Sequence, residues 1–139
     1  MISADMIDEQ FAEEFAGEWE KAWNVHNLEE ILAHYFEDFQ MTSPFIPTVM
    51  NEPSGTLKGK VGEYCRKALD RFPKLTVKSQ MVLVGQNSIV IRYRSFRSEL
   101  DLEAPEVMIF GDHGKVIESI PHHDELYIKF LRRKNGTLC

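Results

Sequence analysis

Residues 75–96 read LTVKSQMVLVGQNSIVIRYRSF, and this stretch establishes the fold class. Apolar and polar side chains alternate over most of residues 75–84 and again over residues 88–96, which is the period of a half-buried β-strand. The segment between them, GQNS at residues 85–88, is typical of a turn. The stretch therefore predicts two strands joined as a hairpin.

More strand follows toward the C-terminus. After a polar loop, Pro105 opens an apolar strand that runs through Phe110. The segment GDHG at residues 111–114 is a second turn, and a last strand is expected from Lys115 to about His123.

Helical patterns precede the hairpin. The first is expected to start near Asp5 and has an apolar residue at every fourth position: Ile7, Phe11, Phe15, Trp19 and Trp23. A second helix is expected from Asn27, an N-cap whose capping box is completed by Glu30. Its apolar face would carry Leu28, Ile31, Leu32, Tyr35 and Phe39.

A loop and a third helix complete the N-terminal half. Residues 44–59 contain three prolines and two glycines and are expected to form a loop. The third helix would place Val61, Tyr64, Cys65, Ala68, Leu69 and Phe72 on one side and end at Pro73. Helices followed by hairpin-linked strands predict an α+β domain with an antiparallel sheet.

Size and charge limit the classes of function. A chain of 139 residues fits one domain, and its net charge of −6 disfavours nucleic acid as a partner. The two cysteines, Cys65 in a helical pattern and Cys139 at the end, favour a reducing, cytoplasmic location over a disulfide. We find no signal peptide pattern and no apolar window long enough for a membrane span.

Three segments together resemble a known superfamily. They are WNVHNLEEILAHYFEDFQMTSP at 23–44, GTLKGK at 55–60 with Tyr64 and ALDRFP at 68–73, and EVMIFGDHGKV from residue 106. In this order they resemble the nuclear transport factor 2-like superfamily, and its SnoaL-like branch most of all. The resemblance implies a cone: a strongly bent antiparallel sheet around three helices, of the cystatin-like type, with an internal pocket. It also implies one domain over residues 1–139, with a core at about 7–123 and a C-terminal extension at 124–139, and a homodimer formed through the outer face of the sheet.

The resemblance also argues against one activity. Ketosteroid isomerases of this superfamily use an Asp base just before a proline, where this chain has Ser43 and Pro44. Their oxyanion-hole tyrosine corresponds to Trp19, which cannot ionise usefully. Only their second acid has a counterpart, Glu106, so ketosteroid isomerisation is not expected.

Glu106 is the leading candidate for chemistry. Period-two alternation places Ala104, Glu106, Met108 and Phe110 on one face of their strand. If that face looks into a pocket, desolvation raises the pKa of the carboxyl toward the range useful in acid–base catalysis. The alternative is an outward-facing Glu106, or one paired with Arg92 or Arg94.

His123 is the second candidate. SnoaL-type cyclases use a His and an Asp, so the resemblance makes His123 with Glu106 an analogous pair, although a structural histidine is the default. His122 and His123 would point to opposite faces of a strand, which disfavours a shared metal ion, and no metal site is predicted. The row Glu30, His34 and Asp38 on the second helix is interpreted as a solvated face.

The expected pocket is lined mainly by aromatic side chains. Its predicted residues are Trp19, Trp23, Tyr35, Phe39, Ser43, Tyr64, Phe72, Tyr93 and Met108. Tyr and Trp each need a partner for a polar atom, which a pocket with water or ligand supplies. The alternative is an ordinary aromatic core, which is the interpretation adopted for Phe11, Phe15 and Phe36.

The sequence thus favours a protein that binds a small hydrophobic or oxygenated molecule. If it is an enzyme, cofactor-free proton transfer is expected: isomerisation, cyclisation, dehydration or epoxide opening. A non-catalytic ligand-binding or protein-interaction module is the alternative.

Overall fold

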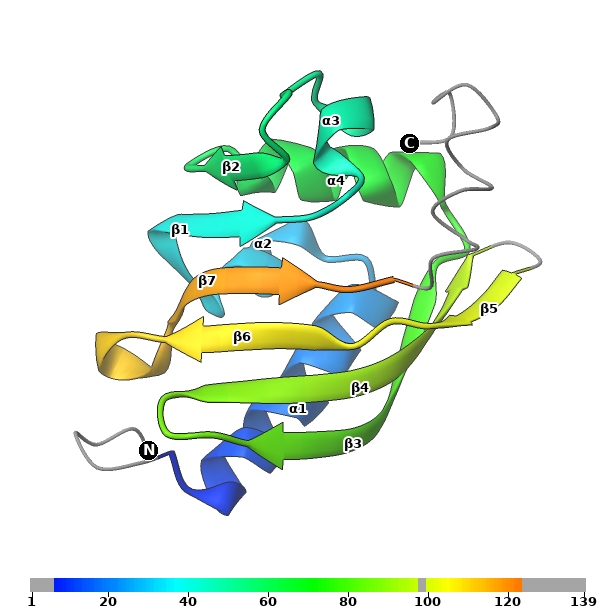
Figure 1. The fold of residues 1–139 in the computed structure, drawn as a ribbon. Helices are drawn as coiled ribbons and strands as arrows, with labels where there is room; N and C mark the ends of the chain where they lie inside the picture. The colour runs from blue at the N-terminus through cyan, green and yellow to red at the C-terminus, as the bar shows by residue number, and fades with distance from the viewer. Residues whose placement is uncertain (1–6, 98–99, 124–139) are drawn as a thin grey trace.

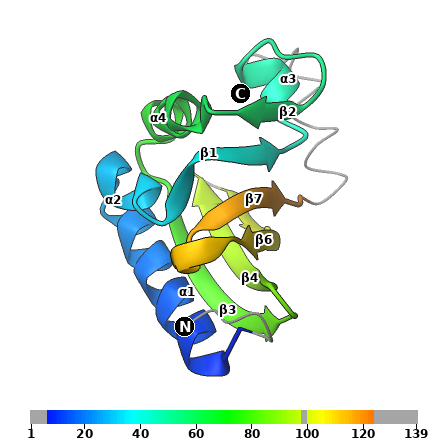
Figure 2. The same cartoon turned by 90° about the vertical axis from the view of Figure 1, so that its left-hand side faces the viewer.

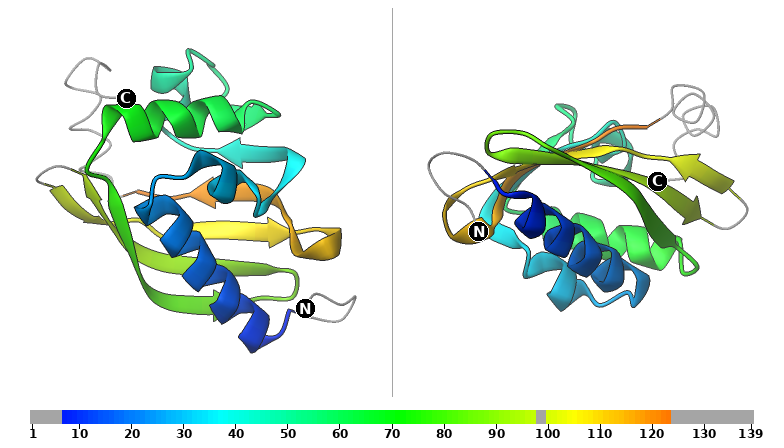
Figure 3. Two further views of the ribbon diagram at one scale, coloured as in Figure 1. Left: turned by 180° about the vertical axis from the view of Figure 1, so that it is seen from behind. Right: turned by 90° about the horizontal axis from the view of Figure 1, so that it is seen from below.

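The computed structural model describes residues 7–97 and 100–123, which form a curved, unclosed sheet with helices on one face (Figures 1 and 3). The helices are α1 (Glu9–Asn24), α2 (Leu28–Leu32), α3 (Ile46–Val49) and α4 (Val61–Arg71), with a 3-10 turn at Asp112–Gly114. The strands are β1 (Tyr35–Thr42), β2 (Thr56–Lys58), β3 (Thr76–Val84), β4 (Ser88–Arg97), β5 (Leu100–Glu103), β6 (Glu106–Phe110) and β7 (Val116–Pro121). The expected C-terminal extension at 124–139 lies outside the described residues.

The sheet confirms the predicted hairpin and corrects one feature of the topology. The strand order is β2-β1-β7-β6-β4-β3, with β5 also paired to β4. The pairs β3–β4, β4–β6 and β6–β7 are antiparallel, but β1 runs parallel to β7. The sheet is therefore mixed, because a strand from the N-terminal half joins the C-terminal strands.

The cap predicted for the second helix forms, whereas the first helix begins later than the predicted start near Asp5. Asp8 caps α1 by accepting a hydrogen bond from the backbone N–H of Phe11 at 2.7 Å. Asn27 caps α2 by accepting one from the N–H of Glu30 at 3.1 Å. Each cap satisfies one of the backbone donors that a helix start leaves unpaired.

The second predicted helix is too long, and this is the largest error of the sequence-based prediction. α2 ends at Leu32, and Tyr35 and Phe39 belong to strand β1. Tyr35 and Phe39, four positions apart, are both buried, whereas Glu37 between them is exposed. The register of β1 against β7 shifts in this interval and interrupts the regular alternation, so the remaining spacing of four matches that of a helix. Phe36, expected in the core, is 50% exposed because it lies between the two inward positions.

Two predicted loops contain further structure. Residues 44–59 hold α3 and β2, with left-handed backbone at Gly55 and Gly59 (φ 74° and 75°) that favours glycine. The polar segment after β4 forms β5, which pairs with β4. Both segments extend the sheet beyond the four strands expected from the sequence.

The core lies between the helices and the curved sheet (Figure 2). Phe11 and Phe15 of α1 contact the ring of Phe110 edge-on, with centroid separations of 5.2 and 4.9 Å. Such edge-to-face contacts are favourable for aromatic rings. Within the described part of the chain, no helix combines the length and apolar character that a membrane span requires.

Candidate ligand pocket

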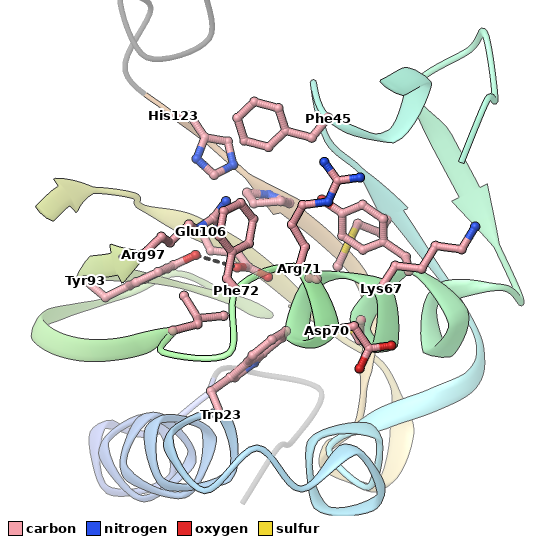
Figure 4. Close-up of a pocket in the computed structure, with 16 residues that line it drawn as sticks. Trp23, Phe45, Lys67, Asp70, Arg71, Phe72, Tyr93, Arg97, Glu106 and His123 are labelled. Atoms are coloured by element: carbon pink, nitrogen blue, oxygen red, sulfur yellow. Dashed lines mark hydrogen bonds between the residues drawn. The ribbon is translucent and has the colours of Figure 1, made fainter. Parts of the chain in front are cut away.

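A pocket of about 470 Å³ opens beside α4, at the end of the core that α3 borders (Figure 4). Its lining residues come from six elements and their flanking turns: Trp23, Met41, Phe45, Tyr64, Cys65, Lys67, Ala68, Asp70, Arg71, Phe72, Leu75, Tyr93, Arg97, Glu106, Pro121 and His123. The volume falls within the range of about 300–1,000 Å³ that is typical of small-molecule sites.

Strand alternation directs the side chain of Glu106 into this pocket. Ala104, Glu106, Met108 and Phe110 are all buried, and Glu106 is only 5% exposed. In the sheet Glu106 lies opposite Ile91 on one side and Pro121 on the other, so it shares the inner face with both. The carboxyl group therefore lies in an environment built mainly of apolar side chains.

Two hydroxyl groups bind the Glu106 carboxylate. Tyr93 donates to Oε1 at 3.2 Å and Ser119 donates to Oε2 at 2.5 Å. Burial raises the pKa of Glu106 above its ordinary value, while Ser119, Tyr93 and the charge of His122 act in the opposite direction. The net shift is upward because the loss of hydration is the largest effect.

Tyr93 stays a hydrogen-bond donor. Burial, together with the nearby Glu106 charge, raises the pKa of its hydroxyl well above the usual range. Cys65, completely buried in the same wall, has its pKa raised to about 12 by burial and Glu106. The thiol is therefore protonated and unreactive as a nucleophile.

The alternative ion pairs of Glu106 do not form. Arg92 pairs with Glu103 at 2.6 Å, and Arg94 pairs with Asp101 at 2.8 Å. Both carboxylates belong to the β5 segment that the sequence analysis interpreted as a loop. The two arginines are therefore occupied on the opposite face of β4 from Tyr93.

His123 lies in the pocket wall, and His122 is exposed. The His123 ring centroid is 4.4 Å from that of Phe45. Burial first, and then the charges of Arg97 and His122, lower the pKa of His123 to about 3. Its imidazole is therefore neutral at physiological pH. Within residues 7–97 and 100–123, no three side chains of the metal-ligating types gather around one point.

The row Glu30, His34 and Asp38, interpreted from the sequence as a solvated helix face, does not lie on one helix, because Asp38 belongs to β1. His34 instead contacts the Glu18 carboxylate at 3.3 Å, close to the protein surface.

The predicted pocket residues divide into two layers. Four of them line the pocket: Trp23, Tyr64, Phe72 and Tyr93. Five are absent from its lining and are buried in the core or the adjoining turn: Trp19, Tyr35, Phe39, Ser43 and Met108.

The residues absent from the pocket lining form hydrogen bonds and ring contacts with other parts of the protein. The indole N–H of Trp19 donates to the Tyr35 hydroxyl at 3.2 Å, and the Tyr35 ring stacks on Phe39 with centroids 4.3 Å apart. Ser43 accepts a hydrogen bond from the N–H of Phe45 at 3.3 Å, which supports the turn into α3. These groups have partners inside the protein, so a ligand is not needed to supply them.

Sequence reasoning missed Ser119, Arg71 and Arg97. Ser119 lies opposite Met108 in the sheet, and therefore next to Glu106 on the same face. Alternation along the last strand could have placed Ser119 on the inner face. It could not show that Ser119 lies next to Glu106, because the pairing register depends on both strands.

Comparisons with known proteins agree with this architecture. No protein-family model matches the chain, and no curated protein matches it in sequence. The crystal structure of a SnoaL-like protein of unknown function from Burkholderia thailandensis is 39% identical, with a TM-score of 0.80, over 86% of this chain and 99% of that chain.

More distant structures share the fold alone. An NTF2-like protein of unknown function from Burkholderia pseudomallei is 17% identical, with a TM-score of 0.69, over 88% of this chain and 95% of that one. A de novo designed protein with a curved β-sheet is 14% identical, with a TM-score of 0.68, over 91% and 96%. Since a designed protein has this fold, function must be argued from the pocket.

Proposed function

This chain belongs to the SnoaL-like family, and on that basis we propose that its pocket binds a small, hydrophobic, oxygenated molecule and that Glu106 exchanges a proton with it. The observation that carries the proposal is the environment of Glu106, a buried carboxyl beside a pocket of suitable volume. A carboxyl with a raised pKa can release and accept protons nearer to neutral pH than an exposed one.

The pocket residues fit distinct roles in such a reaction. Glu106 takes a proton from a carbon, or gives one to an oxygen, of the bound molecule. Tyr93, as a protonated phenol, donates its hydrogen bond to the carboxyl and holds it in place. His123 contributes a neutral imidazole at the pocket wall, which suits hydrogen bonding better than proton transfer. Isomerisation, cyclisation, dehydration and epoxide opening all need a step of this kind.

The same proposal includes the shape and assembly of the protein. The curved sheet and its helices form a cone around the pocket, and two copies pair through the outer face of the sheet. Support for the pairing comes from exposed apolar residues on the strands: Phe36, Met81, Leu83, Phe96 and Ile117, each at least 42% exposed. Apolar surface of this kind is typical of interaction sites.

A general-base probe tests the proton transfer. In 5-nitrobenzisoxazole, a base removes the ring C–H proton, the electron pair forms a nitrile, and the N–O bond breaks to give a coloured phenolate. The proton passes to the Glu106 carboxylate. We expect the rate to rise with pH, with a midpoint above the ordinary carboxyl value of 4.5.

The matched variants are Glu106→Gln and Glu103→Gln. Glu106→Gln should slow the reaction by about 100-fold or more while binding of the probe, measured by calorimetry, survives. Glu103 pairs with Arg92 outside the pocket lining, so Glu103→Gln should leave the rate unchanged. If the original chain binds the probe but converts it no faster than Glu106→Gln does, the proton-transfer proposal is wrong and the chain is a non-catalytic binding module.

A further inference from the structure

Strand β4 carries Arg92, Arg94 and Arg97, and they differ in their partners. Arg92 and Arg94 each pair with a carboxylate of the β5 segment. Arg97 is the one that lines the pocket, and it pairs with no carboxylate of residues 7–97 and 100–123. A guanidinium at a pocket wall that no carboxylate of the described residues neutralises is suited to an anion bound in the pocket.

Arg97 is also held in place. Its guanidinium carbon lies 5.2 Å from the ring centroid of Phe72, and its Nε donates to the hydroxyl of Ser95 at 3.2 Å. Ser95 is itself buried at 2% exposure. The ring and the hydroxyl hold the guanidinium in place. The positive charge of Arg97 acts on groups inside the pocket, since it lowers the pKa of both His123 and Tyr93.

Arg71 adds a second positive charge to the pocket from the last turn of α4. Figure 4 shows its side chain extending toward Phe45, while Asp70 and Lys67 project in other directions. Arg71 and Arg97 therefore give the pocket lining two guanidinium groups.

We infer that the molecule bound in this pocket is a carboxylic acid with an apolar ring system, whose carboxylate pairs with Arg97 with support from Arg71. This inference rests on the proposed function and names its ligand class. The planar fork of a guanidinium matches the two oxygens of a carboxylate. Trp23, Tyr64 and Leu75 provide contacts for the rings.

Three probes of one shape test the inference: 2-naphthoate, the neutral 2-naphthamide and 2-naphthyl phosphate. Affinities are measured by isothermal titration calorimetry on the full chain. We expect 2-naphthoate to bind at least about tenfold more tightly than the amide, as a charged hydrogen-bonded pair in a partly buried site should. Phosphate binding tighter than carboxylate binding would overturn the assignment of a carboxylic acid.

Variants locate the effect. Arg97→Gln should remove the preference for naphthoate over the amide, and Arg97→Lys should retain only part of it because the fork is lost. Arg94→Gln removes the same charge from the same strand and should leave the preference intact. Equal losses in Arg97→Gln and Arg94→Gln would overturn the inference, since they would indicate a general effect of charge.

The probes also separate the two proposals. Equal binding of naphthoate and naphthamide overturns the carboxylate inference and leaves the proposed pocket function standing. Binding of none of the three probes overturns the proposed function, and the inference falls with it.

Discussion

The hydroxyl of Ser119 donates a hydrogen bond to Oε2 of Glu106 across 2.5 Å, where Ser119 is 0% and Glu106 5% exposed. Hydrogen bonds to an ionised oxygen are short and strong. This contact works against burial: it favours the charged carboxylate that the surrounding apolar side chains disfavour. Ser119 therefore tunes how readily Glu106 gives up its proton.

Ser119→Ala should raise the pKa of Glu106 further, because it removes a donor to the charged form. Tyr93→Phe should act in the same direction, and less strongly, since its hydrogen bond is longer at 3.2 Å. The carboxyl signal of Glu106 in an NMR pH titration reports the change directly. An unchanged or lower midpoint in Ser119→Ala would contradict the tuning role.

Glu106→Gln should stabilise the protein increasingly as pH rises. Because the folded-state pKa of Glu106 is raised, its contribution to stability is fully present below the unfolded value near 4.5 and is lost as pH rises through the folded value. Glutamine does not ionise, so the advantage of the variant should grow by at most about 1.4 kcal/mol per pH unit and then level off. Urea unfolding of both proteins across a pH series measures it. A constant difference would show that the pKa is not raised.

His123 should produce the opposite dependence on the acid side. Its pKa is lowered to about 3 from 6.5, so the unfolded chain takes up a proton in this range before the folded chain does. Stability should therefore fall as pH decreases from 6.5 toward 3, by at most about 1.4 kcal/mol per pH unit from this group. His123→Gln should flatten this acid-side slope. His122→Gln, which removes an exposed imidazole and only the smallest of the three causes, is the control and should keep most of the slope.

The Trp19–Tyr35 pair should stabilise the core. Tyr35→Phe leaves the buried indole N–H of Trp19 without its acceptor and should cost about 1–3 kcal/mol of unfolding free energy. The double variant Tyr35→Phe with Trp19→Phe removes both polar atoms. The destabilisations of the two single variants should therefore add up to more than the destabilisation of the double variant. Chemical denaturation of the four proteins gives the coupling energy. Strict additivity would mean that the hydrogen bond contributes nothing.

The outer face of the sheet should control assembly. Leu83 is 48% exposed on β3, and Leu83→Lys places a charge among the apolar residues proposed to pair two copies. Light scattering after gel filtration should show a dimer for the original chain and a monomer for the variant. Lys78→Ala on the same strand, which adds no charge, should remain dimeric. A monomeric original chain would contradict the proposed pairing.

Local patterns in the sequence determined much of this protein. Alternation predicted the β3–β4 hairpin and placed Glu106 on one strand face with Ala104, Met108 and Phe110, while a capping residue, Asn27, marked the start of α2. These predictions succeed because strand faces and helix caps depend on residues a few positions apart. The family was evident in the same way, from the order of short segments.

Only the tertiary structure decided what surrounds Glu106. Strand β1 was mistaken for helix because its pairing with β2 and β7, and the irregularity between Tyr35 and Gln40, involve segments distant in the chain. Strand register brings Ser119 to Glu106 and Arg97 to the pocket, and Trp19 lies in the core, where it is hydrogen-bonded to Tyr35. Such relationships depend on contacts between remote residues, which periodicity along one segment does not encode.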